Sequence, residues 1–335
     1  MTSSELVKQT LEFKNPERIP RQLWTLPWAE IKYNEELKEI QTIYPDDIAL
    51  VPPFLKKSLH QKGARYSKGI FIDEWGCVFE NLEDGIHGEV KDPIIKDWDD
   101  IENLHIPEER LTINLDKINK FCQETDKFVL PDNVQRPFER LQFLRRTDIL
   151  LMDLVEQPEG LQKLIEVIDE FYREELKIWC QTDVDGIFLM DDWGAQNVLL
   201  INPEMWRRLF KPLYEEYIKI AHENGKYVFM HSDGHISSIL GDLIEIGVDA
   251  INSQLFCMDI VEIGRRYKGQ ITFWGEIDRQ HLLPYGSKED IESAVKKVHD
   301  NLYQNGGIIA QCEFGPGARP ENVKKVFETW NRIDT

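Results

Sequence analysis

Polar residues that could do chemistry follow five short apolar runs in the second half of the chain. In a parallel sheet the carboxyl ends of the strands share one edge, and α/β enzymes carry their reacting groups there. We therefore expect the polar segments after these runs to meet in space. They are Asp191-Asp192-Trp193-Gly194, His231-Ser232-Asp233-Gly234, Asn252-Ser253-Gln254, Gly275-Glu276-Ile277-Asp278 and Gln311-Cys312-Glu313.

Three of these segments offer the ligand types that zinc prefers. His231, Glu276 and Cys312 supply an imidazole, a carboxylate and a thiol, and three protein ligands with one open position are typical of catalytic zinc. Asp233 follows His231 by two residues, so it can point to the same side of an extended segment or cap the next helix. A cysteine after a strand is more often a small buried residue. Spacing alone leaves the metal site and these ordinary roles equally open.

Two adjacent carboxylates, Asp191 and Asp192, form a second candidate group. Neighbouring like charges raise one pKa, so the pair could act as acid and base or hold a substrate group; a solvated loop is the alternative. Trp193 directly after them could form a flat wall of a pocket. A similar cluster, with Glu74 at its centre, occurs at residues 73–76.

The elements that must position these residues alternate between strands and helices. We expect strands at residues 22–24, 48–51, 127–131, 186–190, 227–230, 249–253, 270–274 and 307–310. We expect helices at residues 4–13, 112–124, 137–146, 158–182, 203–224, 235–246, 259–267 and 287–304, with a last helix after Pro320. Eight strands joined by helices predict one α/β domain over residues 1–335, a (β/α)8 TIM barrel with N-terminal decorations that include a hairpin at 69–80. No glycine-rich nucleotide-binding motif is present.

The composition narrows the class of protein. Sixty acidic and forty basic residues give a net charge of −20, which disfavours nucleic acid and anionic membrane surfaces as partners. Five cysteines without a C-x-x-C pair favour a reducing compartment. No apolar run approaches the roughly 20 residues of a membrane span. We therefore expect a cytoplasmic protein.

The motifs together resemble the uroporphyrinogen decarboxylase superfamily. The resemblance is carried by Asp185-Gly186-Ile187-Phe188 with Asp191-Asp192-Trp193-Gly194, Pro203-Glu204-Met205-Trp206, His231-Ser232-Asp233-Gly234, Gly275-Glu276-Ile277-Asp278 and Pro320-Glu321-Asn322-Val323. It implies a (β/α)8 barrel. The decarboxylase branch carries an Arg-Gln-Ala-Gly-Arg motif that binds carboxylates, whereas here Arg21-Gln22 is followed by Leu23-Trp24-Thr25. The sequence shows no replacement cluster of cations, which disfavours a polycarboxylate substrate.

The other branch comprises corrinoid-dependent methyltransferases, whose zinc ligands form a His-x-Cys motif with a distant second Cys. The resemblance places these ligands at His231, Asp233 and Cys312, with Asp in place of the middle Cys and Glu276 as the alternative third ligand. An oxygen donor makes the site harder, which suits a Lewis acid acting on an ether oxygen. We therefore expect a zinc-dependent methyltransferase that moves a methyl group from a methoxylated aromatic, an O-demethylation, to the cob(I)amide of a separate corrinoid protein.

In this interpretation Asp191, Asp192 and Glu276 are catalytic, and the small aromatic methyl ether is bound by Trp193, Glu74, Trp24 and Gln254. The resemblance also suggests a homodimer. The alternatives are a methyltransferase from methylcorrinoid to a thiol or to tetrahydrofolate, a decarboxylase of the uroporphyrinogen type, and a barrel that only binds a ligand.

Overall fold

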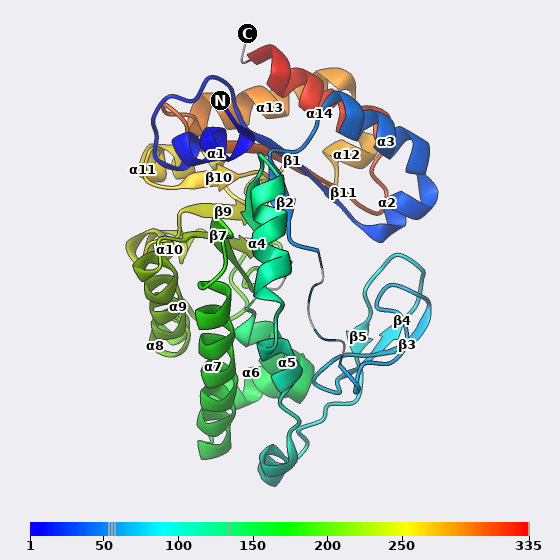
Figure 1. Ribbon diagram of the computed structural model, residues 1–335, viewed down its shortest axis with the longest axis vertical. Helices are drawn as coiled ribbons and strands as arrows, with labels where there is room; N and C mark the ends of the chain where they lie inside the picture. Colours follow the sequence, from blue (N-terminus) through cyan, green and yellow to red (C-terminus); the bar gives the residue numbers. More distant parts are fainter. Residues whose placement is uncertain (53, 55, 57, 133–134, 334–335) are drawn as a thin grey trace.

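A six-stranded parallel sheet forms the centre of the computed structural model, which describes residues 1–52, 54, 56, 58–132 and 135–333 (Figure 1). Its order is β1-β11-β10-β9-β8-β7, and every neighbouring pair is parallel. The strands are β1 (Arg21–Thr25), β7 (Gly186–Met190), β8 (Tyr227–Ser232), β9 (Ala250–Ser253), β10 (Thr272–Trp274) and β11 (Ile308–Phe314).

Two further parallel strands, β2 (Ile48–Leu50) and β6 (Phe128–Leu130), pair with each other in a separate ladder. Both are three residues long. Single backbone hydrogen bonds link them to the main sheet, from Asp47 N to Arg21 O (2.8 Å) and from Asp185 N to Val129 O (2.9 Å). The predicted α/β class with parallel strands is confirmed, but the closed (β/α)8 barrel is not, because the sheet is open at these two places.

Alternate residues of the strands belong to two buried clusters. Phe188, Phe229, Trp274 and Ile309 pack together and against Val7 and Leu11 of the first helix. Their sequence neighbours, such as Leu189, Met230 and Ala310, join the larger core that is shared with the outer helices. The period of two in a strand explains this division, and it decides below which way the site residues point.

The helices pack outside the strands, and the first and last of them bring both termini to one end of the molecule (Figure 1). Among the described residues, no helix is long and apolar enough to span a membrane. The α-helices are α1 (Ser3–Leu11), α2 (Pro27–Lys32), α3 (Asn34–Ile43), α4 (Leu115–Glu124), α5 (Pro137–Arg145), α6 (Thr147–Glu156), α7 (Glu159–Trp179), α8 (Pro203–Leu209), α9 (Lys211–Glu223), α10 (Leu240–Glu245), α11 (Ile260–Tyr267), α12 (Leu282–Tyr285), α13 (Lys288–Leu302) and α14 (Pro320–Ile333), with 3₁₀ turns η1 (Trp98–Asn103), η2 (Glu108–Leu111) and η3 (Leu255–Cys257).

The bounds of several elements differ from expectation, among them one helix and one strand of the second half of the chain. The helix expected at 203–224 is divided into α8 and α9 at Phe210, because Pro212 stands in the first turn of α9 and cannot continue a preceding helix. The strand expected at 307–310 continues to Phe314. Gln311, Cys312 and Glu313 therefore lie within β11 and not after it.

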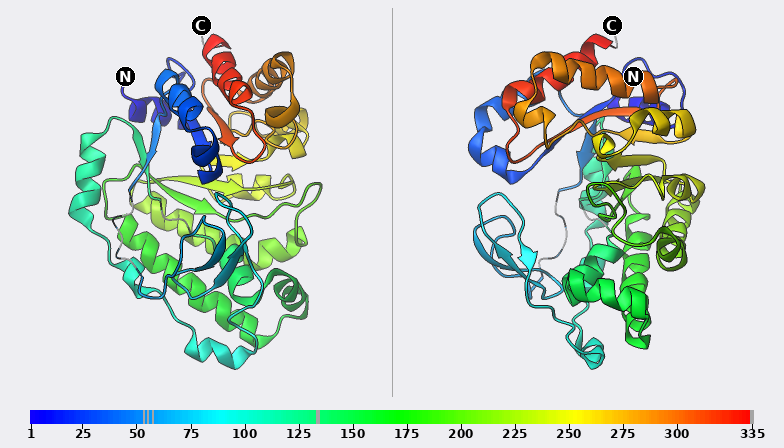
Figure 2. Two further views of the ribbon diagram at one scale, coloured as in Figure 1. Left: turned by 90° about the vertical axis from the view of Figure 1, so that its right-hand side faces the viewer. Right: turned by 180° about the vertical axis from the view of Figure 1, so that it is seen from behind.

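The predicted hairpin is present as a small antiparallel sheet of β3 (Gly69–Ile72), β4 (Val78–Asn81) and β5 (Glu89–Val90). It stands apart from the main sheet and next to α5, as the two further views also show (Figure 2). A buried ion pair holds it there, because Arg140 of α5 donates to Asp73 at 2.6 Å and both side chains are about 5% exposed.

Candidate functional site

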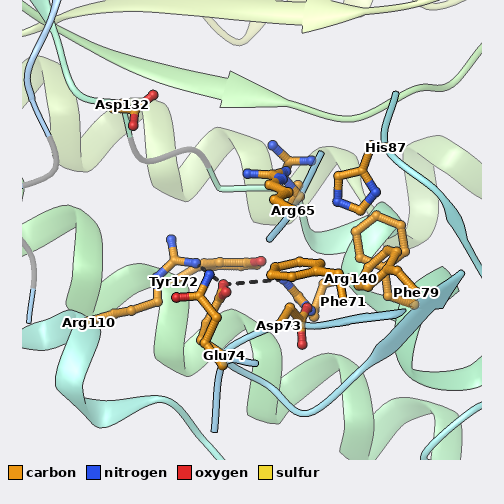
Figure 3. Close-up of a pocket in the computed structure, with 13 residues that line it drawn as sticks. Arg65, Phe71, Asp73, Glu74, Phe79, His87, Arg110, Asp132, Arg140 and Tyr172 are labelled. Atoms are coloured by element: carbon orange, nitrogen blue, oxygen red, sulfur yellow. Dashed lines mark hydrogen bonds and ion pairs between the residues drawn. The ribbon is translucent and has the colours of Figure 1, made fainter. Parts of the chain in front are cut away.

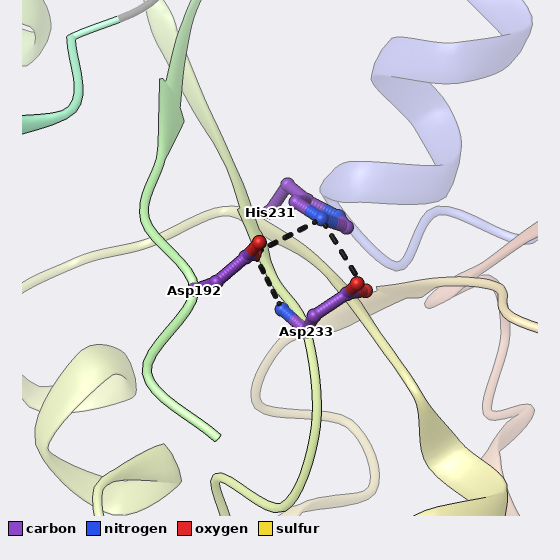
Figure 4. Close-up of side chains that lie close together, drawn as sticks. All are labelled: Asp192, His231 and Asp233. Atoms are coloured by element: carbon purple, nitrogen blue, oxygen red, sulfur yellow. Dashed lines mark hydrogen bonds and ion pairs between the residues drawn. The ribbon is translucent and has the colours of Figure 1, made fainter. Parts of the chain in front are cut away.

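Asp192, His231 and Asp233 come together at the carboxyl ends of β7 and β8 (Figure 4). Each offers one ligand atom, and the three atoms lie within 4.8 Å of one another. The imidazole Nε2 of His231 is 3.4 Å from Asp192 Oδ1 and 3.5 Å from Asp233 Oδ1. In the part of the chain that the structure describes, this is the only such group of three. We call it the triad.

The neighbouring strand fixes the ring of His231. Its Nδ1 is 2.6 Å from Asn252 Oδ1, and the amide nitrogen of Asn252 donates to the carbonyl of Trp274. The amide oxygen of Asn252 therefore accepts from Nδ1–H, which leaves Nε2 to face the two carboxylates. The ring of Trp24 packs against the imidazole at a centroid distance of 5.1 Å, so Trp24 lies at the site as expected.

Two glycines bring the loops of the triad into backbone contact. Gly194 N donates to Asp233 O at 3.0 Å, and a Cβ on Gly194 would lie 2.3 Å from His235 N and 2.4 Å from the carbonyl carbon of Gly234. Only residues without a Cβ permit this approach. Asp233 N also donates to Asp192 Oδ1 at 3.0 Å. The close contact of the loops is what places the two carboxylates on either side of His231.

The charges of the triad shift the pKa values of His231 and Asp192 in opposite directions. Burial lowers the pKa of His231, but its hydrogen bond to Asp192 and the charges of Asp233 and Asp192 outweigh burial and raise the pKa to about 10. Burial raises the pKa of Asp192, but the hydrogen bond and charge of His231 outweigh it and lower the pKa to about 2. In this state the imidazole is protonated between the two carboxylates, and a cation bound at Nε2 would displace that proton.

Arg279 joins the triad to two further carboxylates. Its guanidinium pairs with Asp233, with Glu313 at 3.0 Å and with Glu276 at 3.4 Å. Burial raises the pKa of Glu276 well above its usual range, although the charge of Arg279 opposes this. Sequence reasoning missed Arg279, although it stands three residues after Glu276. It placed Glu313 among the polar segments but gave it no role.

The residues of the triad fit a divalent cation. Asp233 Oδ1 and Glu276 Oε1 are buried and make no hydrogen bond, and buried carboxylate oxygens normally have a partner. One imidazole and two carboxylates are accepted by zinc, although such a donor set is harder than one with thiolates. Glu276 was an expected ligand; it lies beside the triad through Arg279 and is not one of its three members.

The structure does not bring Cys312 to His231. Because β11 continues to Phe314, Cys312 points with Ala310 and Phe314 into the core shared with the helices, while Gln311 and Glu313 point to the other face. The Cys312 side chain is fully buried, and burial raises the pKa of its thiol. The geometry therefore gives no support to Cys312 as a zinc ligand, and Asp192, expected to be catalytic, takes the third place.

Asp191 and Trp193 point away from the triad. Asp191 accepts the backbone N–H groups of Phe138 (3.0 Å) and Glu139 (2.7 Å) at the start of α5, and the hydroxyl of Tyr214 donates to it. Trp193 is fully buried and stacks on Phe138 at a centroid distance of 4.1 Å. Their contacts are those of a helix cap and a core residue, so the expected pocket wall at Trp193 is absent.

Gln254 lies in a small pocket beside the triad, together with Gln196, Cys257 and Arg279. The thiol of Cys257 donates to Gln254 Oε1 at 3.2 Å, and Gln196 Nε2 lies 3.5 Å from the same sulfur. This pocket agrees with the expected placement of Gln254 near the site.

Glu74 lines a different pocket, between the hairpin and α5 (Figure 3). It pairs with Arg110 and, at 3.7 Å, with Arg140. Burial raises the pKa of Glu74, but the two arginines outweigh it and lower the pKa to about 2. Arg65 and Arg136 line the same pocket. The fold therefore assembles a cluster of four arginines that the sequence did not reveal, because they come from separate segments.

One of the similar solved structures shares this fold over its whole length. A methyltransferase from Methanosarcina mazei has a TM-score of 0.68 and 14% sequence identity, with 100% of both chains covered. A 3-keto-D-glucoside 4-epimerase from E. coli has a TM-score of 0.39 and 12% identity over 66% of this chain and 84% of its own. The IOLI protein with a binding zinc atom has a TM-score of 0.37 and 17% sequence identity, with 68% of this chain and 84% of its own chain covered. The last two scores are too low to carry an argument.

The comparison with curated proteins gave no match. The model of the uroporphyrinogen decarboxylase family, URO-D, matches residues 71–333, which is well over half of the chain. These residues run from within β3 to the end of α14. They include the triad, Arg279 and three of the four arginines, whereas Arg65 lies before the matched region. The chain therefore belongs to the uroporphyrinogen decarboxylase (URO-D) family.

Proposed function

We propose that the protein is a zinc-dependent methyltransferase that moves a methyl group from a methoxylated aromatic to the cob(I)amide of a separate corrinoid protein. The triad of Asp192, His231 and Asp233 carries this proposal. The fold shared with the Methanosarcina mazei methyltransferase over the full length of both chains supports it.

The chain's own residues would hold and orient the reacting groups. Asp192, His231 and Asp233 would bind the metal, and Asn252 would fix the imidazole by its hydrogen bond to Nδ1. A divalent cation held there would supply Lewis acidity to the ether oxygen, and the corrinoid of the partner protein would supply the cobalt(I) nucleophile for the methyl carbon. The aryl oxygen would keep the electron pair of the broken bond. Arg279 would restrain the second carboxylate oxygen of Asp233 through its ion pair.

Direct methyl transfer tests the proposal. The protein is incubated with zinc, cob(I)alamin and a methoxylated aromatic, and the cobalt spectrum is followed. We expect methylcob(III)alamin to form with the protein and not with His231→Ala. If no aryl methyl ether methylates cobalt, the donor assignment is wrong; transfer from methylcobalamin to a thiol or to tetrahydrofolate would then establish the reverse direction. Release of CO₂ from uroporphyrinogen without metal would establish a decarboxylase.

A further inference from the structure

Four arginines from three segments of the sequence line one pocket next to the hairpin. They are Arg65 before β3, Arg110 in η2, Arg136 before α5 and Arg140 within α5. The cavity volume of the pocket is about 90 Å³, and the space between its lining atoms rises to about 540 Å³ when the part open to solvent is included. Figure 3 shows Arg65 with His87 on one side and Arg110 with Glu74 on the other.

The arginines differ in how well their charges are paired. Arg110 Nε donates to Glu175 at 2.9 Å and its terminal nitrogen to Glu74, while Arg140 donates to Asp73 at 2.6 Å. Within the described part of the chain, Arg65 has no carboxylate at ion-pair distance.

The pairing of Arg136 is loose. Its nearest carboxylate oxygen, Glu139 Oε2, is 3.4 Å away and makes no hydrogen bond. Arg140, which is 4% exposed, also keeps a buried Nε without a hydrogen-bond partner. Buried donors without a partner are costly. The pocket therefore contains arginine donors that could still bind an anion.

Aromatic rings form the rest of the pocket. Phe71, Phe79 and Tyr172 line it and are almost fully buried, and the ring of His87 packs edge-on against Phe79 at 4.5 Å. Burial, together with the charge of Arg65, lowers the pKa of His87 to about 4, so the ring is neutral at pH 7. Flat apolar walls beside guanidinium groups match a ligand that carries both an aromatic ring and a negative charge.

The pocket lies close to the triad. Arg136 lines the pocket and lies 3.4 Å from Glu139 of α5. Glu139, the loose partner of Arg136, donates its backbone N–H to Asp191, the residue before Asp192. A small aromatic ligand whose anionic group meets Arg136 can therefore extend toward the metal ligands.

We propose that this arginine pocket binds the carboxylate of an aromatic acid, so that the methyl donor is a methoxylated aromatic acid and not a neutral ether. The inference rests on the proposed function for the role of the ligand as donor. Guanidinium groups bind planar carboxylates in bidentate pairs, and the two loosely paired arginines, Arg65 and Arg136, would make these contacts.

Binding of matched probes tests the inference without methyl transfer. Isothermal titration calorimetry on the full chain compares 3-methoxybenzoate with 3-methoxybenzamide, which has the same ring and ether but no charge. We expect the acid to bind at least tenfold more tightly. Arg65→Gln and Arg136→Gln should each weaken the acid about tenfold and leave the amide unchanged. Arg265→Gln is the control, because Arg265 is exposed on α11 and pairs only locally with Glu262.

Two binding results and one activity result would overturn the inference. Equal affinity for the acid and the amide would show that no charge is recognised. Inorganic phosphate that binds as tightly as the acid, and is weakened by the same variants, would show that the pocket does not select an aromatic acid. If the acid binds through Arg65 and Arg136 but no methylcob(III)alamin forms, the proposed function fails and the pocket stands. If a neutral ether donates its methyl group as fast as the acid does, the proposed function stands and the inference about the arginine pocket fails.

Discussion

The position of Cys312 gives a direct test of the metal ligands, because resemblance and geometry disagree about it. The resemblance makes Cys312 a zinc ligand, whereas the structure buries its thiol in the core on the helix side of β11. Cys312→Ala removes one buried sulfur atom and leaves a small cavity, which should lower the free energy of unfolding by on the order of 1–2 kcal/mol. We expect the zinc content to stay unchanged.

His231→Ala, Asp192→Asn and Asp233→Asn should behave in the opposite way. Each removes a donor of the triad, and the loss of a ligand should weaken zinc by more than the ten- to hundredfold that is usual for outer-shell changes. A hundredfold loss corresponds to about 2.7 kcal/mol, so the zinc-induced rise in melting temperature should shrink in these variants and persist in Cys312→Ala.

The assay is metal analysis after dialysis against trace zinc, with melting curves taken in the presence and absence of zinc. Cys180→Ala is the matched control, since Cys180 is also buried and lies at the end of α7, far from β11 in sequence. If folded Cys312→Ala loses zinc as completely as His231→Ala does, the reasoning from strand parity is refuted. If no variant and not even the unchanged protein binds zinc, the triad is an ion-pair network and the metal assignment is wrong.

Three further predictions concern the residues around the site. Burial raises the pKa of Asp46 to about 6, although the hydrogen bond that Asp46 accepts from Leu23 N opposes this shift. The folded state therefore binds the proton of this carboxyl group more tightly than the unfolded chain does. The free energy of unfolding should fall as the pH rises from about 4 to above 6. Asp46→Asn should remove this pH dependence and raise the free energy of unfolding by up to about 3 kcal/mol at pH 7.5, as measured by urea unfolding at pH 4.5 and 7.5. The same pH dependence in the variant and the unchanged protein would contradict the burial of Asp46. Gly194→Ala should push the two loops of the triad apart, because its Cβ would lie 2.3 Å from His235 N; we expect a loss of about 1–3 kcal/mol and of zinc binding, and retention of both would argue against the close approach. Arg140→Met leaves the carboxylate of Asp73 buried and unpaired, which should lower the free energy of unfolding by about 3–5 kcal/mol. Adding Asp73→Asn to this variant should restore part of the lost stability. Hydrogen exchange of Arg140→Met should show that the hairpin at 69–90 opens first.

The edge that carries the site could be predicted from the sequence for a simple reason. Parallel strands joined by helices place their carboxyl ends together, so polar residues at and after the ends of β7 and β8 must be neighbours. His231 and Asp233 were identified in this way and do meet. Which side chain turns inward is a finer question. It depends on the last residue of β11, which apolar content placed at Ala310 and the structure places at Phe314. A strand four residues longer changed Cys312 from a loop residue to one of fixed orientation.

The charges at the site show why composition could not reveal the rest. A net charge of −20 predicts a surface that repels anions, yet the fold gathers Arg65, Arg110, Arg136 and Arg140 in one pocket and sets Arg279 among three carboxylates. The four arginines of the pocket are spread over 75 residues and meet only because the hairpin docks on α5. The sign of the charge in one region of the protein therefore depends on which segments pack together there. An acidic protein can recognise an anion when its carboxylates are already engaged by some of its arginines and others are left loosely paired.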